Sequence, residues 1–124
     1  MADFKARQQS KLHGGAGDRI AGAQLAAGRR HVEDCTGRFS LRETFATIAG
    51  ASVVVCNPSM AMHAAAAFRK PCLVPTGSYF RDAAQHAAQW TYPETRLLGP
   101  SAAHPEVWTP EEAWPMLAEL LAAS

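Results

Sequence analysis

The chain has 124 residues, of which 48% are apolar and 19% are charged, and its formal net charge is +1. This length fits one globular domain over residues 1–124, and this composition excludes a disordered chain. The charge balance gives no electrostatic basis for binding nucleic acid or an acidic membrane. No apolar run approaches the ~20 residues of a transmembrane segment.

The cysteines exclude a disulfide scaffold and a zinc ribbon, because their number is odd and no CxxC occurs. The N-terminal residues contain no apolar core of a secretory signal. We therefore expect a cytoplasmic protein with three reduced thiols, two of them inside strands: Cys35, Cys56 and Cys72. The histidines show no metal-ligand spacing, so we expect neither a metal ion nor a cofactor. They are His13, His31, His63, His86 and His104.

The first third of the chain shows a glycine turn at 14–18 followed by a predicted helix over 19–28. Asp18 is the expected N-cap, and Gly28 is the expected stop. A short strand is predicted over 31–34. The next helix has the strongest start signal of the chain, because Ser40 and Glu43 form a capping box before apolar positions at helical spacing. Gly50 ends it.

The second part of the chain alternates strands with helices. Residues 52–56 are a continuous, mostly β-branched run, which predicts a strand buried on both faces. A break at 57–59 precedes an alanine-rich helix. Thr109 and Pro110 mark the start of the last helix. The elements predicted after the break are helices over 60–69, 82–90 and 111–123 and strands over 72–75 and 96–98.

This alternation is typical of βαβ units and predicts an α/β fold. We expect a Rossmann-like parallel sheet of about four or five strands with helices on both faces. Ligands of such sheets bind beyond the carboxyl ends of the strands. The loops expected there are 14–18, 34–39, 56–63 and 76–80.

The order of several motifs carries a family resemblance. In sequence they are 36–43 (TGRFSLRE), 48–51 (IAGA), the strand at 53–57, His63 with its alanine helix, Lys70-Pro71 and Gly77. They resemble the C-terminal domain of glycosyltransferase family 9, the ADP-heptose–lipopolysaccharide heptosyltransferases. The glycine turn at 14–18 is similar to an earlier turn of that family. The resemblance covers roughly residues 11–100 and implies the C-terminal half of a GT-B fold.

The resemblance also implies a function. Members of the family have two Rossmann-like domains that face each other across a cleft. The C-terminal domain holds the nucleotide-sugar donor, usually ADP-heptose, and the other domain binds the lipid-linked acceptor and supplies the base. The chain is similar to the donor half only. It is thus expected to bind a nucleotide-diphosphate sugar in lipopolysaccharide biosynthesis, to need an acceptor domain for catalysis, and to carry no identifiable catalytic residue.

The resemblance places donor and phosphate contacts at the start of the alanine helix and after the following strand. A helix N-terminus offers free N–H groups and partial positive charge to a diphosphate. Pro58 stands where the family has an aspartate that contacts the donor. The expected donor and phosphate residues are Asn57, Ser59, Met60, Met62, His63 and Gly77.

A second set is expected where family members hold the adenosine, because carboxylates after a strand can accept from ribose hydroxyls. This nucleotide-binding set is Gly15, Glu33, Asp34 and Thr36. The glycine turn itself is no dinucleotide fingerprint, because Ile20 occupies the sixth position. His86, Trp90 and Tyr92 form an aromatic cluster that favours core packing over base stacking.

The same residues can also have purely structural roles. Ser59 can act only as a helix cap while His63 packs against its strand, and residues 33–36 can be a solvated loop. The alternative function is a non-catalytic Rossmann-like module that binds a nucleotide or a protein. An open sheet edge would favour a homodimer.

Overall fold

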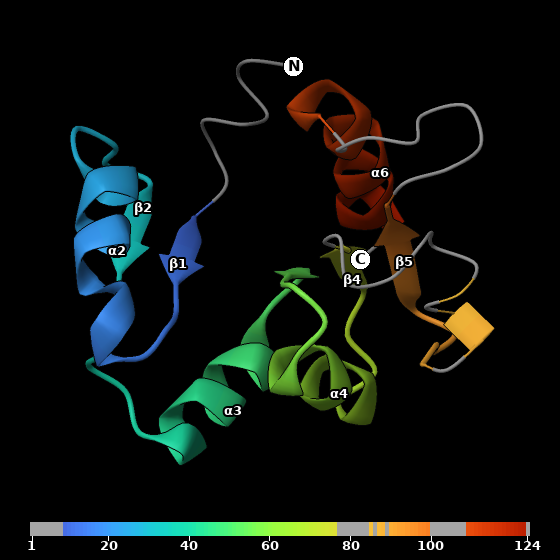
Figure 1. The fold of residues 1–124 in the computed structure, drawn as a ribbon, viewed down its shortest axis with the longest axis horizontal. Helices are drawn as coiled ribbons and strands as arrows, with labels where there is room; N and C mark the ends of the chain where they lie inside the picture. The colour runs from blue at the N-terminus through green and yellow to red at the C-terminus, as the bar shows by residue number, and fades with distance from the viewer. Residues whose placement is uncertain (1–8, 77–84, 86, 89, 100–108, 124) are drawn as a thin grey trace. The chain divides into compact units, whose positions relative to one another are not determined.

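A computed structural model describes residues 9–76, 85, 87, 88, 90–99 and 109–123 (Figure 1). The chain divides into two compact units, Met1–Thr44 and Phe45–Ser124. Every strand pair among the described residues is parallel.

The first unit is a βαβ arrangement. Strands β1 (Ser10–Leu12) and β2 (Val32–Asp34) pair side by side, with Ser10 opposite Val32. A single 3-10 turn, η1 (Ala16–Asp18), and helix α2 (Arg19–Ala26) connect them. Gly28 follows the C-cap of α2 with φ +71°, a left-handed conformation that glycine adopts without steric cost. The predicted stop of this helix is confirmed.

Helix α2 approaches the end of β2 unusually closely at Gly22. A Cβ atom at Gly22 would lie 2.6 Å from Thr36 Oγ1 and 2.7 Å from Asp34 Oδ1. Real side chains essentially never come that close, so only glycine fits between the helix and this loop. The sequence pattern alone did not single out this glycine.

The second unit contains a three-stranded parallel sheet in the order β3–β4–β5. The strands are β3 (Val54–Val55), β4 (Cys72–Pro75) and β5 (Thr95–Leu98). Strand β4 lies in the middle, and Cys72, Leu73 and Val74 are all buried. Strand β3 is shorter than predicted, and Val55 is 54% exposed. The expectation that both faces of 52–56 are buried is therefore wrong at Val55.

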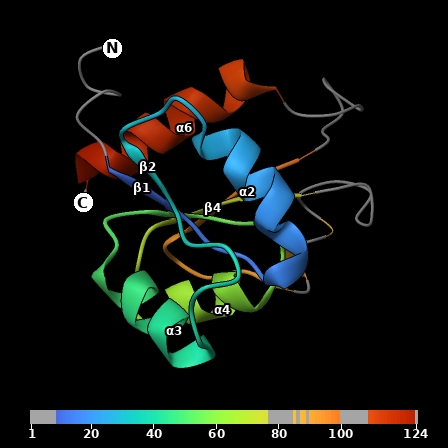
Figure 2. The same cartoon turned by 90° about the vertical axis from the view of Figure 1, so that its left-hand side faces the viewer.

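Helices cover both faces of this sheet, as expected. Side chains alternate along a strand, and Cys72 and Val74 join the core under α4 (Met60–Ala67) while Leu73 joins the core under α6 (Pro110–Ala123). Both views place α4 and α6 on opposite sides of β4 (Figures 1 and 2). Ile48 of α3 (Leu41–Gly50) belongs to the α4 core.

Local capping chemistry sets the helix starts. Ser40 donates its N–H to Glu43 Oε1 at 3.0 Å, and Glu43 N–H donates to Ser40 Oγ at 3.2 Å, so the predicted capping box is confirmed. Thr109 Oγ1 accepts the N–H of Glu112 at 3.3 Å at the start of α6. The predicted helix over 82–90 lies mostly outside the described residues. Within this range, the described residues 85, 87 and 88 are helical.

Candidate functional site

Helix α4 begins at a capped and polar end. Ser59 is its N-cap, with an extended backbone at φ −161°. Ser59 Oγ accepts the N–H of Ala61 at 3.3 Å, and the Ser59 carbonyl accepts the N–H of Met62 at 3.1 Å. Helix geometry leaves the N–H of Met60 without an acceptor inside the helix. One donor at the positive end of the helix dipole is thus available to an anion.

The absence of acidic side chains distinguishes the start of α4 from the other helix starts that the structure describes. The first turn of α4 contains no acidic residue. In contrast, α3 has Glu43, α6 has Glu111 and Glu112, and Asp18 closes η1 and directly precedes α2. A bound diphosphate meets no carboxylate at the N-cap or in the first turn of α4, whereas α2 has Asp18 at its N-cap, so α4 has the electrostatically favourable start among the described helices.

His63 is held in one orientation by an aromatic pair. Its Nδ1 lies 2.6 Å from the Tyr92 hydroxyl. Trp90 meets the imidazole edge to face with 5.0 Å between ring centroids, and Tyr92 does so at 5.7 Å. Because Tyr92 occupies Nδ1, a ligand can bond only to Nε2. Sequence reasoning missed this link, having grouped Trp90 and Tyr92 with His86, which lies outside the described residues.

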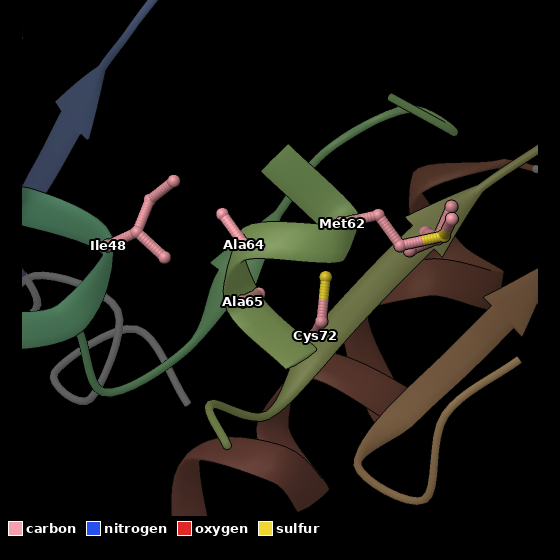
Figure 3. Close-up of a cluster of buried hydrophobic side chains, with 6 residues drawn as sticks. Ile48, Met62, Ala64, Ala65 and Cys72 are labelled. Atoms are coloured by element: carbon pink, nitrogen blue, oxygen red, sulfur yellow. The ribbon is translucent and has the colours of Figure 1, made fainter. Parts of the chain in front are cut away.

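The remaining residues of the expected phosphate set differ in what they offer. Asn57 and Met60 are exposed. Met62 is only 1% exposed and packs into the core beside Ala65 and Cys72 (Figure 3). Its N–H is already bonded to Ser59, so Met62 offers a ligand neither its side chain nor its amide. The turn of α4 directs it to the sheet, and we assign it to packing. Gly77 lies outside the described residues.

In the first unit, the glycine turn folds onto its own aspartate. The N–H of Gly15 donates to Asp18 Oδ2 at 2.9 Å. A Cβ at Gly14 would lie 2.7 Å from the same oxygen. The Asp18 carboxylate therefore occupies the position beside Gly15 at which an anion would bind. This arrangement agrees with a structural turn rather than a phosphate loop.

Asp34 and Thr36, of the expected nucleotide set, bond to each other. Asp34 Oδ1 accepts from the Thr36 hydroxyl at 2.6 Å and from the Thr36 N–H at 3.0 Å. These two bonds hold the pKa of the Asp34 carboxyl below its usual value, and the bond from the Thr36 hydroxyl has the larger effect. Glu33 is exposed and lies 3.9 Å from Lys11 Nζ across the strand pair. Neighbouring strand residues point to opposite faces, so Glu33 and Asp34 do not share one ligand face.

Two further features of the described residues bear on the chemistry. They contain no group of three or more His, Cys, Asp or Glu side chains placed to hold a metal ion. None of the helices built from them is long and apolar enough to cross a lipid bilayer.

The parallel sheet of the second unit, with helices on both faces, has the architecture of a GT-B half. Two solved structures share it. The structure of E. coli ADP-heptose LPS heptosyltransferase II matches 98% of this chain with a TM-score of 0.75 and 21% identity. The glycosyl transferase family 9 structure from Veillonella parvula DSM 2008 matches 99% of it with a TM-score of 0.78 and 16% identity. The predicted α/β fold is confirmed.

The likeness extends over part of each of those proteins. The chain spans 39% of the E. coli structure and 40% of the Veillonella structure. No protein-family model and no curated protein matches the sequence. At 21% and 16% identity, the likeness establishes the fold of the chain.

Proposed function

We propose that the chain is a nucleotide-sugar-binding domain of the heptosyltransferase kind, with an ADP-heptose-like donor. The observation that carries the proposal is the fold likeness to an ADP-heptose LPS heptosyltransferase over 98% of this chain. The motif order along residues 36–77, which resembles that family's donor half, supports it independently of the fold.

The start of α4 is the proposed diphosphate site. Met60 offers an N–H, His63 offers Nε2, and Ser59 fixes the first turn by capping it. Asn57 is exposed directly before this turn. These groups would bind and orient the diphosphate, and the helix dipole would stabilise the charge that develops on it as a leaving group. We keep Gly77 as a proposed contact from the resemblance alone.

In the first unit, Asp34 is the proposed acceptor of a ribose hydroxyl. Its Oδ1 is used by Thr36, which leaves Oδ2 for a ligand, and its lowered pKa keeps the carboxylate ionised. Glu33 is the second acceptor, on the opposite strand face. Gly15 contributes only if a ligand displaces Asp18 from its amide.

Binding, rather than transfer, is the activity we assign to these residues. Pro58 replaces the aspartate that the family uses at the donor, and we assign no catalytic base. In a complete enzyme, a second Rossmann-like domain would bind the lipopolysaccharide acceptor and activate its hydroxyl.

Calorimetric titration of the chain with ADP, UDP and GDP tests the proposal. We expect weak binding of one diphosphate, ADP first, and a tighter complex with the matching ADP-sugar. The absence of heat with all three nucleotides at millimolar concentration contradicts it.

A second candidate function is a protein-interaction module. The observation that favours it is on α2, where Ile20 is 77% exposed and Leu25 is 58% exposed. Contiguous exposed apolar patches mark surfaces that bind another protein, and we propose that Ile20 and Leu25 belong to such a surface. A homodimer detected by light scattering, and lost in the Ile20→Glu variant, supports this function, whereas a monomer at high concentration contradicts self-association.

A further inference from the structure

Two thiols of the second unit lie next to each other. Cys72 is in the central strand β4, and Cys56 directly follows the neighbouring strand β3. Their Sγ atoms are 3.7 Å apart, within hydrogen-bond distance for sulfur. Both side chains belong to the core under α4. No local sequence pattern predicts this pair, because 16 residues separate the two positions.

The two thiols differ in access and in acidity. Cys72 is fully buried, whereas Cys56 is half-buried. The hydrogen bond between the two thiols holds the pKa of Cys56 below its usual value. The same bond, together with burial, raises the pKa of Cys72. Because the thiolate is the nucleophile, Cys56 is the thiol that reacts first with a reagent from solvent.

We propose that Cys56 and Cys72 form a thiol-modification site that reacts with low-molecular-weight disulfides to give an intramolecular disulfide. The Cys56 thiolate attacks one sulfur of the reagent, forms a mixed disulfide and releases one thiolate. Displacement of the Cys56 segment then admits solvent to the otherwise buried Cys72 thiol, which loses its proton and attacks Cys56 Sγ, and this releases the second thiolate. Two protein thiols are oxidised, and one reagent disulfide is reduced to two thiols.

The local structure allows the second step. A disulfide needs the two sulfurs at about 2.05 Å, so they must approach from their present separation. Cys72 is fixed between two neighbouring strands, with Val54 on one side and Thr95 on the other. Cys56 lies beyond the last residue of β3 and is followed by an exposed residue, Asn57. We expect Cys56 to be the partner that moves, and this movement breaks the bond from its N–H to the Leu73 carbonyl, which is 3.1 Å long.

This movement would displace the segment that leads into α4. Ser59, the N-cap of α4, is three positions after Cys56. We expect the disulfide to weaken ADP binding at the start of α4, and this consequence rests on the proposed function. The thiol chemistry itself does not depend on it.

Cys35 provides the matched control. It is a free thiol, is buried, and belongs to the first unit. Burial raises the pKa of the Cys35 thiol, so we expect it to react slowly with the same reagent.

The test treats the reduced chain with an aromatic disulfide reagent whose released thiolate absorbs light, and records intact mass and released thiolate together. We expect the native chain and Cys35→Ala to release two thiolates rapidly per chain and to retain no adduct. Cys72→Ala should release one thiolate and keep a stable adduct, and Cys56→Ser should show no rapid phase. Peptide mapping of the native product should join Cys56 to Cys72.

A stable adduct on the native chain, or a disulfide that includes Cys35, overturns the proposal. The native-chain mapping decides the question even where Cys72→Ala does not fold. Titration of the oxidised chain with ADP separates the two ideas. If the disulfide forms while ADP binds neither the reduced nor the oxidised chain, the proposed function fails and the thiol site stands.

Discussion

At the scale of single residues, the candidate site depends on the contact between His63 and Tyr92. The 2.6 Å separation of Nδ1 and the hydroxyl fixes the ring and determines which nitrogen faces a ligand. This contact joins residues 29 positions apart, so no local pattern could predict it. In contrast, Ser59 was predictable as a cap, because its bond to Ala61 spans two residues.

Removing the Tyr92 hydroxyl tests this contact. We expect Tyr92→Phe to lower the free energy of unfolding by about 0.5–1.5 kcal/mol, because one hydrogen bond is lost. It should also weaken ADP binding by releasing His63. Urea unfolding of the native chain, Tyr92→Phe, His63→Ala and the double variant forms a double-mutant cycle, which measures the coupling between the two side chains. Equal effects of Tyr92→Phe in the presence and absence of His63 would show that the contact contributes nothing.

Removing the Ser59 cap separates stability from binding. Ser59→Ala and Ser40→Ala each delete an N-cap hydroxyl, and we expect each to cost about 0.5–2 kcal/mol of stability. Only Ser59→Ala should lower the affinity for ADP, because Ser40 caps α3, where Glu43 completes a capping box. Thermal unfolding and calorimetry on both variants check this. Equal loss of ADP binding in the two variants counts against a site at α4.

His13 should make the first unit sensitive to acid. Burial and the nearby Lys11 charge lower the pKa of His13, the Glu33 charge opposes them, and neither ring nitrogen has a hydrogen-bond partner among the described residues. Because the pKa of His13 is lower in the folded chain than the usual ~6.5, protonation favours the unfolded chain. The contribution of neutral His13 to stability is complete above pH ~6.5 and is lost as the pH falls toward the folded-state pKa.

We therefore expect the urea midpoint to decrease as the pH is lowered from 7.5 to about 5.5. The variant His13→Gln should show a smaller decrease. His31→Gln is the matched control and should retain the full decrease. An unchanged pH dependence in His13→Gln would show that His13 does not titrate on unfolding.

At the scale of secondary-structure elements, helix ends could be predicted from the sequence, whereas the position of a strand within its sheet could not. The capping boundaries of α3 and α6 followed from residues three positions apart, and these predictions are confirmed. The exposure of Val55 did not follow from its run of β-branched neighbours. Whether a strand is central or at the edge depends on pairing with distant segments, which hydrophobicity along one segment does not encode.

The close approach of α2 to β2 gives a prediction at this scale. In Gly22→Ala, the new Cβ would meet Thr36 Oγ1 and Asp34 Oδ1, which hold each other by hydrogen bonds. We expect a loss of about 1–3 kcal/mol from overpacking, although alanine favours a helix by about 1 kcal/mol. Gly50→Ala in α3 is the control, because its Cβ would meet nothing within 4 Å. Denaturant unfolding of both variants distinguishes them, and equal stability of the two contradicts the close packing.

At the scale of the whole molecule, the order of motifs predicted the fold better than any single motif did. Alternating strands and helices indicated a parallel α/β domain, and the structural likeness to two glycosyltransferase structures confirms that class. The candidate site was less predictable. The start of α4 could be located from the sequence, whereas the burial of Met62 and the position of Tyr92 depend on how α4 packs against the sheet.

The most direct measurement is an NMR titration of the isotope-labelled chain with ADP. We predict saturable shifts of the backbone amides of Ser59, Met60 and His63, at a described helix start with no acidic side chain at its N-cap or in its first turn. The amides at the start of α6, where Glu111 and Glu112 lie, should stay unchanged. Unmoved α4 amides at millimolar ADP, or equal shifts at both helix starts, would contradict a diphosphate site on this fold.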